Sequence, residues 1–193
     1  MALCQCQTDL TGGSTAYCNS TNIFCLNNEE VKCFAECING PEEIDLTARI
    51  VFGEARGECI EEQLALAYSI ANRVNHTGYP DTIEGVIGKM YKKGRVHEYN
   101  TLDNHNHNSS FEEARMQHTA AYNLTIGVSV AAICQCKPDP TNGATDFCVP
   151  DPSKGSCSAT EDNKYYHSVN NIRIGQHMFA SRAQVDSVQL IGK

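Results

Sequence analysis

A glutamate at the end of a predicted helix is the residue in this sequence best suited to catalysis. Glu54 follows an apolar run with helical spacing and lies just before Gly57, where the helix is expected to stop. The negative end of a helix dipole and partial burial both favour the neutral, protonated carboxyl group. A protonated carboxylic acid is the proton donor that cleavage of a glycosidic bond requires. The first hypothesis is therefore an acid-catalysed sugar hydrolase, and the alternative is an exposed glutamate at a polar helix end.

The helices that would position Glu54 are predicted from apolar residues at helical spacing and from end signals. Pro41 at a first helical position, followed by two glutamates, opens the helix that carries Glu54. A capping box at residues 110–113 opens a later helix, which Gly127 would end. The predicted helices run from Pro41 to before Gly57, from about Ile60 to Val74, from a cap at Asp81 through Met90, and from Ser110 to about Ile126.

Residues 92–109 are polar and rich in histidine and asparagine, and we predict a long loop there. Its possible metal ligands are His97, Asp103, His105 and His107. These residues do not form a complete ligand set with a standard spacing, so a solvated loop is the preferred interpretation. Neither a metal nor any other cofactor is predicted. The mixed pattern of residues 164–181 predicts no particular element.

The two ends of the chain repeat each other. Residues 3–18 align without gaps on residues 133–148, and both copies contain a glycine turn signal, Thr11-Gly-Gly in the first and Thr141-Asn-Gly in the second. We predict a small cystine-rich hairpin at each place. The predicted organisation is an N-terminal hairpin extension, residues 1–38, that copies residues 133–157, and then one domain, residues 39–193, that includes the second hairpin at residues 130–158.

Eleven cysteines occur, and they cluster at the two ends of the chain with only Cys59 between the clusters. Their spacing does not match the Cys-x-x-Cys pairs of zinc knuckles, so disulfide bonds are preferred. The candidates are Cys4, Cys6, Cys18, Cys25, Cys33, Cys37, Cys59, Cys134, Cys136, Cys148 and Cys157. The odd number leaves one thiol that is either free and buried or paired with another molecule.

Cysteines and glycosylation signals together favour an oxidising, secreted or extracellular setting. The candidate acceptors are Asn19, Asn75, Asn108 and Asn123. No signal peptide is recognised at Met1, so we expect one to have been removed or omitted. A net charge of −8 without a basic patch argues against a nucleic acid partner, and no apolar stretch is long enough to span a membrane. The same charge would be repelled by anionic bacterial walls.

Several segments resemble the SleB-type cell wall hydrolases, which include spore-cortex-lytic enzymes. They are residues 54–58 (Glu-Ala-Arg-Gly-Glu), 63–67, 72–74 (Asn-Arg-Val), 79–87, 139–147 and 174–179 (Ile-Gly-Gln-His-Met-Phe). The resemblance covers roughly residues 44–181 in the right order. It implies an α+β, lysozyme-like fold with a mostly helical body, to which this sequence adds small disulfide-rich β-hairpins.

The resemblance implies cleavage of a peptidoglycan-like polysaccharide, often as a lytic transglycosylase. Glu54 matches the family's catalytic glutamate, which acts as acid and then as base while the sugar's own 6-hydroxyl attacks, so that no second carboxylate is needed. Glu58, Arg56, Tyr79 and His177 are predicted to support catalysis or bind substrate. A structural ion pair is the alternative for Arg56, and structural hydrogen bonding near the cleft is the alternative for His177.

Two functions of different classes therefore stay open. The first is a secreted glycan-cleaving enzyme that uses Glu54 on a β-1,4-linked amino-sugar polymer. The second is a glycosylated extracellular structural subunit that assembles head-to-tail into disulfide-linked filaments, with or without catalysis. The repeat favours the second, because a terminal copy of an internal element can occupy the equivalent place in a neighbouring molecule. The added cysteines, the N-terminal hairpin copy and the polar segment after Ile87 are departures from the family pattern, and the acidic charge also argues against the enzyme.

Overall fold

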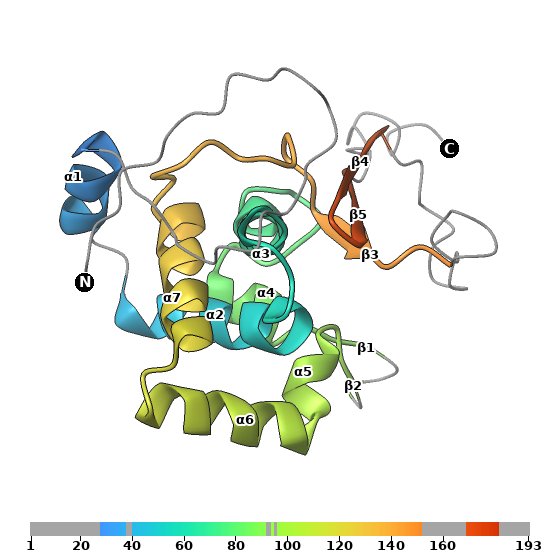
Figure 1. The fold of residues 1–193 in the computed structure, drawn as a ribbon. Helices are drawn as coiled ribbons and strands as arrows, with labels where there is room; N and C mark the ends of the chain where they lie inside the picture. The colour runs from blue at the N-terminus through green and yellow to red at the C-terminus, as the bar shows by residue number, and fades with distance from the viewer. Residues whose placement is uncertain (1–27, 38–39, 92–93, 95, 152–168, 182–193) are drawn as a thin grey trace, which may run out of the picture.

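The computed structural model describes residues 28–37, 40–91, 94, 96–151 and 169–181 (Figure 1). The predicted N-terminal hairpin, with Cys4, Cys6, Cys18, Asn19 and Cys25, lies outside these residues, as does Cys157. The predicted division of the chain at residue 38 therefore stays a prediction.

The described residues form a mostly helical body with a small antiparallel sheet, which confirms the predicted α+β class. The elements are α1 (Asn28–Glu36), α2 (Pro41–Ala55), α3 (Ile60–Val74), α4 (Ile83–Ile87), β1 (Met90–Tyr91), β2 (Val96–His97), α5 (Asn100–Asp103), α6 (His105–Met116), α7 (Ala120–Ile133), β3 (Asp146–Cys148), β4 (Val169–Ile174) and β5 (His177–Ser181). None of the helices in the described ranges has the length and apolar character needed to cross a bilayer.

Helices α2 and α3 are the elements that the sequence predicts best. Pro41 follows the N-cap Gly40 and two glutamates occupy the first turn of α2, as the end signals indicate. Both helices bury apolar residues against α7, and this packing forms the main core, with Ile50, Val51, Leu66, Ile70 and Val128 fully buried. The burial explains why the helical spacing of apolar residues was a reliable signal in these two segments.

Two predicted helix starts, one predicted loop and the predicted helix end at Met90 are wrong, since α4 ends at Ile87 and Met90 lies in β1. Thr82 caps α4, because its hydroxyl oxygen accepts the Gly85 N–H at 3.0 Å, and Asp81 does not have this role. Residues 92–109 are not one long loop, since they contain β2, α5 and the start of α6. The expected capping box at residues 110–113 lies inside α6, whose N-cap is Asn104.

The helix expected to run to Gly127 is instead two helices. α6 ends at Met116, and His118 adopts a φ of 48° that no helix can continue. The Thr119 hydroxyl oxygen then accepts the Tyr122 N–H at 3.2 Å and starts α7, in which Gly127 is buried. A local cap and a positive φ outweigh the helical spacing that runs across both segments.

The sheet has the strand order β3-β5-β4, and its middle strand comes from the segment that had no predicted structure. The glycine turn is formed as predicted, with Asn142 and Gly143 at φ 54° and 85°. However, its N-terminal flank, residues 134–140, is an irregular segment that follows α7 and not a strand, and β3 pairs with β5 through Phe147 and Phe179. The turn is fastened to α3, because the Asp139 carboxylate accepts the Gly143 N–H at 2.8 Å and the Asn72 amide at 2.9 Å.

Two disulfide bonds attach α1 to the end of α7. Cys33 is bonded to Cys136 and Cys37 to Cys134, with Cα–Cα distances of 5.5 and 5.7 Å. Each bond closes a loop of about 100 residues, and a loop of this length is worth about 4–5 kcal/mol in the chain-entropy account. Figure 1 places α1 on the side of the molecule away from the β3-β5-β4 sheet. The two disulfide bonds thus attach α1 to the other helices on the side of the molecule away from the sheet.

Candidate functional site

Glu54 lies in the last turn of α2, where its side chain is half-buried. Oε1 accepts two hydrogen bonds from Thr101 of α5, one from the hydroxyl at 2.5 Å and one from the backbone N–H at 3.2 Å. Within the described part of the chain, Oε2 accepts no hydrogen bond. A carboxyl group held in this way has a fixed orientation and one oxygen available for a proton.

The contact between α2 and α5 requires a glycine next to Glu54. A Cβ atom on Gly53 would lie 2.2 Å from Cγ2 and 2.3 Å from Oγ1 of Thr101. Real side chains do not approach so closely, so any larger residue at position 53 would push Thr101 away from Glu54. The Phe-Gly-Glu order in the sequence therefore has a steric reason.

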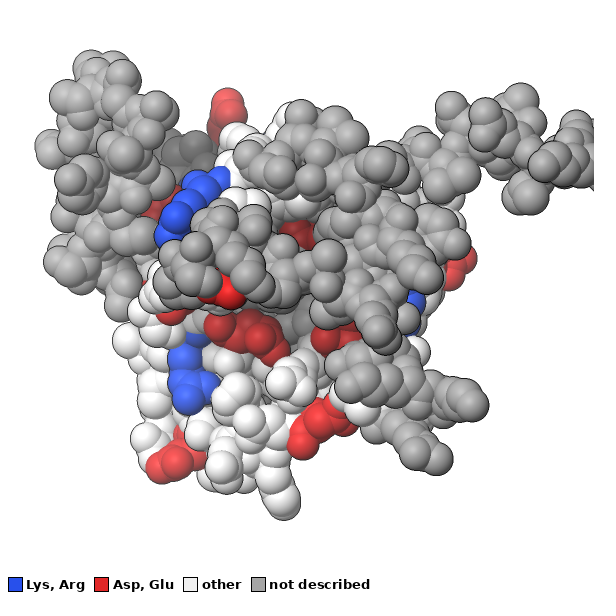
Figure 2. All heavy atoms as spheres, turned by 90° about the vertical axis from the view of Figure 1, so that its right-hand side faces the viewer, with Lys and Arg blue, Asp and Glu red and all other residues white. Residues whose placement is uncertain are grey.

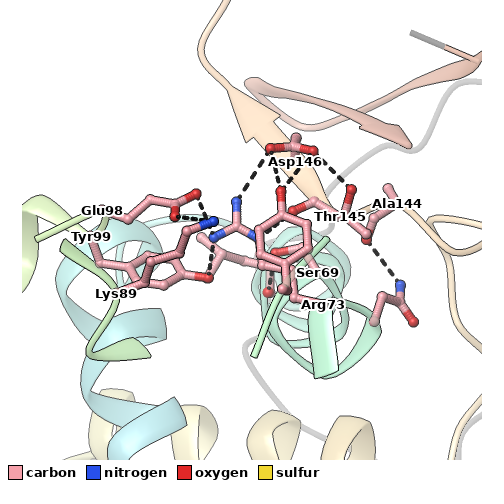
Figure 3. Close-up of polar contacts among 11 residues, drawn as sticks. Ser69, Arg73, Lys89, Glu98, Tyr99, Ala144, Thr145 and Asp146 are labelled. Atoms are coloured by element: carbon pink, nitrogen blue, oxygen red, sulfur yellow. Dashed lines mark hydrogen bonds and ion pairs between the residues drawn. The ribbon is translucent and has the colours of Figure 1, made fainter. Parts of the chain in front are cut away.

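A buried arginine of α3 holds the segment that leads into α5 (Figure 3). The Arg73 guanidinium donates to the Tyr99 hydroxyl at 2.8 Å and to the Thr145 carbonyl, and it lies 3.0 Å from Glu98 and 3.5 Å from Asp146. Figure 3 shows it between Glu98 on one side and Asp146 on the other. This arrangement joins α3, the segment before α5 and β3 in one polar cluster.

The charges of this cluster are mutually compensated. Burial alone would lower the pKa of Arg73, but Tyr99, Glu98, Tyr79 and Asp146 around it raise the pKa, so the guanidinium stays charged. Burial raises the pKa of Tyr99 to about 12, which keeps its hydroxyl protonated. A charged donor and neutral phenol give a stable network that fixes Tyr99, two residues before Thr101.

A second buried charge holds the β4–β5 turn against the start of α3. Oε1 of Glu62 accepts the Gln176 N–H at 2.9 Å and the His177 N–H at 3.1 Å, and it lies 2.6 Å from His177 Nδ1. Burial raises the pKa of Glu62, but the hydrogen bonds from His177 and Gln176 outweigh it and leave the pKa below its usual range. An ionised Glu62 therefore anchors the turn.

Three of the other predicted site residues, Glu58, Tyr79 and His177, contact the Arg73 cluster or the turn that Glu62 holds. Glu58 accepts the Gln176 side-chain amide at 3.1 and 3.2 Å, so it faces the β4–β5 turn. Tyr79 is half-buried in the Arg73 cluster, where its hydroxyl donates to Asp146 at 3.1 Å. His177 is bonded to Glu62, as described above. Arg56 is exposed with its guanidinium 5.0 Å above the Phe52 ring, and the described residues offer it no ion pair.

In the histidine-rich segment, His97 pairs with Asp103, and His105 and His107 belong to a helix. His97 Nδ1 lies 2.7 Å from Asp103 Oδ1, and Asp103 also accepts the His97 N–H at 2.8 Å. These hydrogen bonds from His97 lower the pKa of Asp103. His105 and His107 lie in the first turn of α6. Across the ranges that the structure describes, no three His, Cys, Asp or Glu residues gather as metal ligands would.

Thr101, Glu62 and the role of Arg73 were not predicted from the sequence. Glu62 and Arg73 gave little signal, because neither belongs to the apolar face of the helix predicted over residues 60–74. Thr101 offered none, since it lies in a segment interpreted as a loop and 47 residues from Glu54.

The space-filling view of the sheet end shows acidic side chains at more places than basic ones among the described residues (Figure 2). This agrees with the formal net charge of −8.

Comparison with known proteins identifies the family. Residues 57–180 match the family model described as Cell Wall Hydrolase. This match covers more than half of the chain, and the chain belongs to the cell wall hydrolase family. The matched residues begin at Gly57, so Glu54 lies just before them.

Individual relatives match over a short segment. The chain is 53% identical over 45 residues to the spore cortex-lytic enzyme of Oceanobacillus iheyensis, which is 23% of this chain and 16% of that protein. It is 49% identical over 45 residues to the spore cortex-lytic enzyme of Bacillus subtilis, covering 23% of this chain and 15% of the relative. The chain thus matches less than a fifth of the length of these relatives.

Two solved structures are similar to the chain. One is the catalytic domain of the Bacillus cereus SleB protein, with a TM-score of 0.48, 24% identity, and coverage of 74% of this chain and 91% of that chain. The other is the catalytic domain of the germination-specific lytic transglycosylase SleB from Bacillus anthracis, with a TM-score of 0.46, 23% identity, and coverage of 75% and 98%.

Proposed function

We propose that this protein cleaves the glycan strands of a peptidoglycan-like polymer, with Glu54 as general acid and then general base. The observation that carries the proposal is the state of the Glu54 carboxyl group. Thr101 holds Oε1 with two hydrogen bonds, and Oε2 is left without a partner in the described residues. Membership of the cell wall hydrolase family supports this class of substrate.

The proposed reaction has two proton transfers. Glu54 first gives its proton to the glycosidic oxygen, and the bond between this oxygen and the anomeric carbon breaks with its electron pair going to the oxygen. The ionised Glu54 then takes a proton from the hydroxyl that attacks the anomeric carbon. This hydroxyl belongs either to water, which gives a reducing sugar, or to the sugar's own 6-position, which gives an anhydro sugar and consumes no water.

The surroundings of Glu54 favour a mechanism with one catalytic carboxylate. Glu62 is fully buried and occupied by the β4–β5 turn, and Glu58 is bonded to Gln176. Both carboxylates are thus engaged by the β4–β5 turn, whereas a conventional glycosidase pair needs a second carboxyl group that acts on the substrate. We therefore propose internal attack by the 6-hydroxyl, which needs no second carboxylate, as the main route.

An extracellular setting is part of the proposal. Six described cysteines are all disulfide-bonded, and disulfide bonds persist in oxidising compartments. Among the possible glycosylation acceptors, Asn75 and Asn123 are exposed, whereas Asn108 is half-buried in α6 and donates to the Leu102 carbonyl at 3.2 Å. We propose Asn75 and Asn123 as the acceptors that a glycosyltransferase could reach.

The test is sugar release from purified peptidoglycan by the wild-type protein and by Glu54→Gln. Glutamine keeps the size and the Thr101 contact but cannot donate an acidic proton, so the rate should fall at least about a hundredfold. Glu61→Gln is the matched control, because Glu61 is exposed in the first turn of α3 and should leave the rate unchanged. Mass spectrometry of the products distinguishes anhydro from reducing ends.

A second candidate, self-assembly into filaments, is favoured by the terminal repeat. Cys134 and Cys136 of the internal copy are not available for disulfide bonds to a neighbouring chain, because they are bonded to Cys37 and Cys33 of the same chain. Covalent linkage would therefore fall to the five cysteines outside the described residues. A ladder on a non-reducing gel that collapses on reduction supports this candidate, and a single monomer band argues against it.

A further inference from the structure

We propose that Thr101 is a positioning residue that places the catalytic proton on Oε2 of Glu54. This inference rests on the proposed function, because it assigns a role within the same reaction. Thr101 lies on a different helix from Glu54, and the sequence around it gave no reason to select it.

The two oxygens of a carboxyl group differ in their capacity for hydrogen bonds. A protonated carboxyl group has one carbonyl oxygen, which accepts hydrogen bonds well, and one hydroxyl oxygen, which carries the proton. Oε1 of Glu54 accepts both the hydroxyl and the N–H of Thr101, at 2.5 and 3.2 Å. In the protonated form of Glu54, two donors on Oε1 make it the carbonyl oxygen, and the proton lies on Oε2. This is the oxygen with no partner among the described residues.

The position of Thr101 is fixed before any substrate binds. Its side chain is buried, and it packs against the bare backbone of Gly53, where there is no room for a Cβ atom. On one side of it Arg73 holds Tyr99, and on the other side His97 holds Asp103, so both ends of α5 are fastened. A donor held in this way needs no reorganisation during the reaction.

The same two hydrogen bonds stabilise the charge that the first step creates. When the proton leaves Oε2, the carboxylate becomes ionised, and hydrogen bonds to an ionised acceptor are about twice as strong as those to a neutral one. The gain arises in the transition state and not in the ground state. Loss of the Thr101 hydroxyl should therefore lower kcat and leave KM nearly unchanged.

The experiment compares Thr101→Val and Thr101→Ser with the wild-type protein on soluble peptidoglycan fragments. Valine has the shape of threonine without the donor, so kcat should fall about ten- to a hundredfold while KM stays within about twofold. Serine keeps the hydroxyl and should retain kcat within about threefold. Thr47→Val is the matched control, because Thr47 is a fully buried threonine of α2 whose hydroxyl donates to the Glu43 carbonyl at 2.9 Å.

Melting temperatures of all variants separate loss of structure from loss of positioning. If Thr101→Val does not fold, Thr101→Ala replaces it and should show the same loss of kcat. Wild-type kcat in the valine variant, a serine variant as slow as valine, or a change confined to KM would each overturn the role of Thr101. If Glu54→Gln is as active as the wild type, the proposed function itself fails, and this outcome is distinct because it does not depend on Thr101.

Discussion

Removal of the Glu62 carboxylate should destabilise the protein strongly, because this buried charge fastens the β4–β5 turn to α3. Glu62 has no exposed surface, and its Oε1 contacts two backbone N–H groups and the His177 ring within 2.6–3.1 Å. Breaking a buried, hydrogen-bonded pair by removing one partner costs about 3–5 kcal/mol. For a chain of this length, Glu62→Ala should lower Tm by about 6–20 °C.

The variant Glu62→Gln removes the negative charge of this side chain but keeps nearly the same shape. Glutamine keeps an oxygen that accepts the Gln176 and His177 N–H groups but carries no charge, so the free energy of unfolding should fall by about 1–3 kcal/mol. Glu61→Ala is the control, since this neighbouring glutamate is exposed and should leave Tm unchanged within about 2 °C. Differential scanning calorimetry under non-reducing conditions, with the disulfides intact, measures all three.

The contribution of Glu62 to stability should depend on pH in one direction. Because the pKa of Glu62 is lower in the folded protein than in the unfolded chain, its stabilisation is complete above the ordinary glutamate pKa of about 4.3. The stabilisation is lost as the pH falls through the folded pKa. The difference in Tm between wild type and Glu62→Gln should therefore be large at about pH 7 and shrink below about pH 4. A Glu62→Ala variant within about 4 °C of the wild type, or a difference that grows on acidification, would refute the reasoning.

Two further predictions concern the polar cluster and the turn. Arg73→Met should lower the free energy of unfolding by about 3–5 kcal/mol, because Glu98 and Asp146 lose their buried cation, and Arg73→Lys should lower it less. Urea unfolding measures both variants. Equal stability of the wild type and Arg73→Met would contradict this role of Arg73. Gly175→Ala should cost about 2–5 kcal/mol, because Gly175 has a φ of 59° and a Cβ there would lie 1.9 Å from Glu62. Gly57→Ala, where a Cβ meets nothing within 4 Å, is its control in the same urea series.

The sequence predicted α2 and α3 well because both bury a regular apolar face, so local spacing and tertiary packing agree. The segment from residue 92 to 109 was not predicted, because few of its residues are apolar. α6 exists there because Asn104 caps it and because Phe111 and Ala114 bury against Phe52 of α2. This packing joins residues about 60 positions apart, and no local pattern contains it.

The candidate site was predicted in part for the same reason. Glu54 could be selected from its place at a helix end, which is a local property. The partners that define its chemistry come from other elements, since Thr101 is 47 residues away and the His177 that holds Glu62 is 115 residues from it. The roles of such residues depend on tertiary contacts, and a single sequence does not encode these contacts in any short pattern.

The catalytic role of Glu54 is tested by the rates at which wild type, Glu54→Gln and Glu61→Gln release soluble fragments from purified peptidoglycan at equal concentrations of folded protein. We expect release by the wild type and by Glu61→Gln, and a rate at least about a hundredfold lower for Glu54→Gln. Equal release by Glu54→Gln, or no release by any of the three, would contradict the assignment of Glu54 as the catalytic acid.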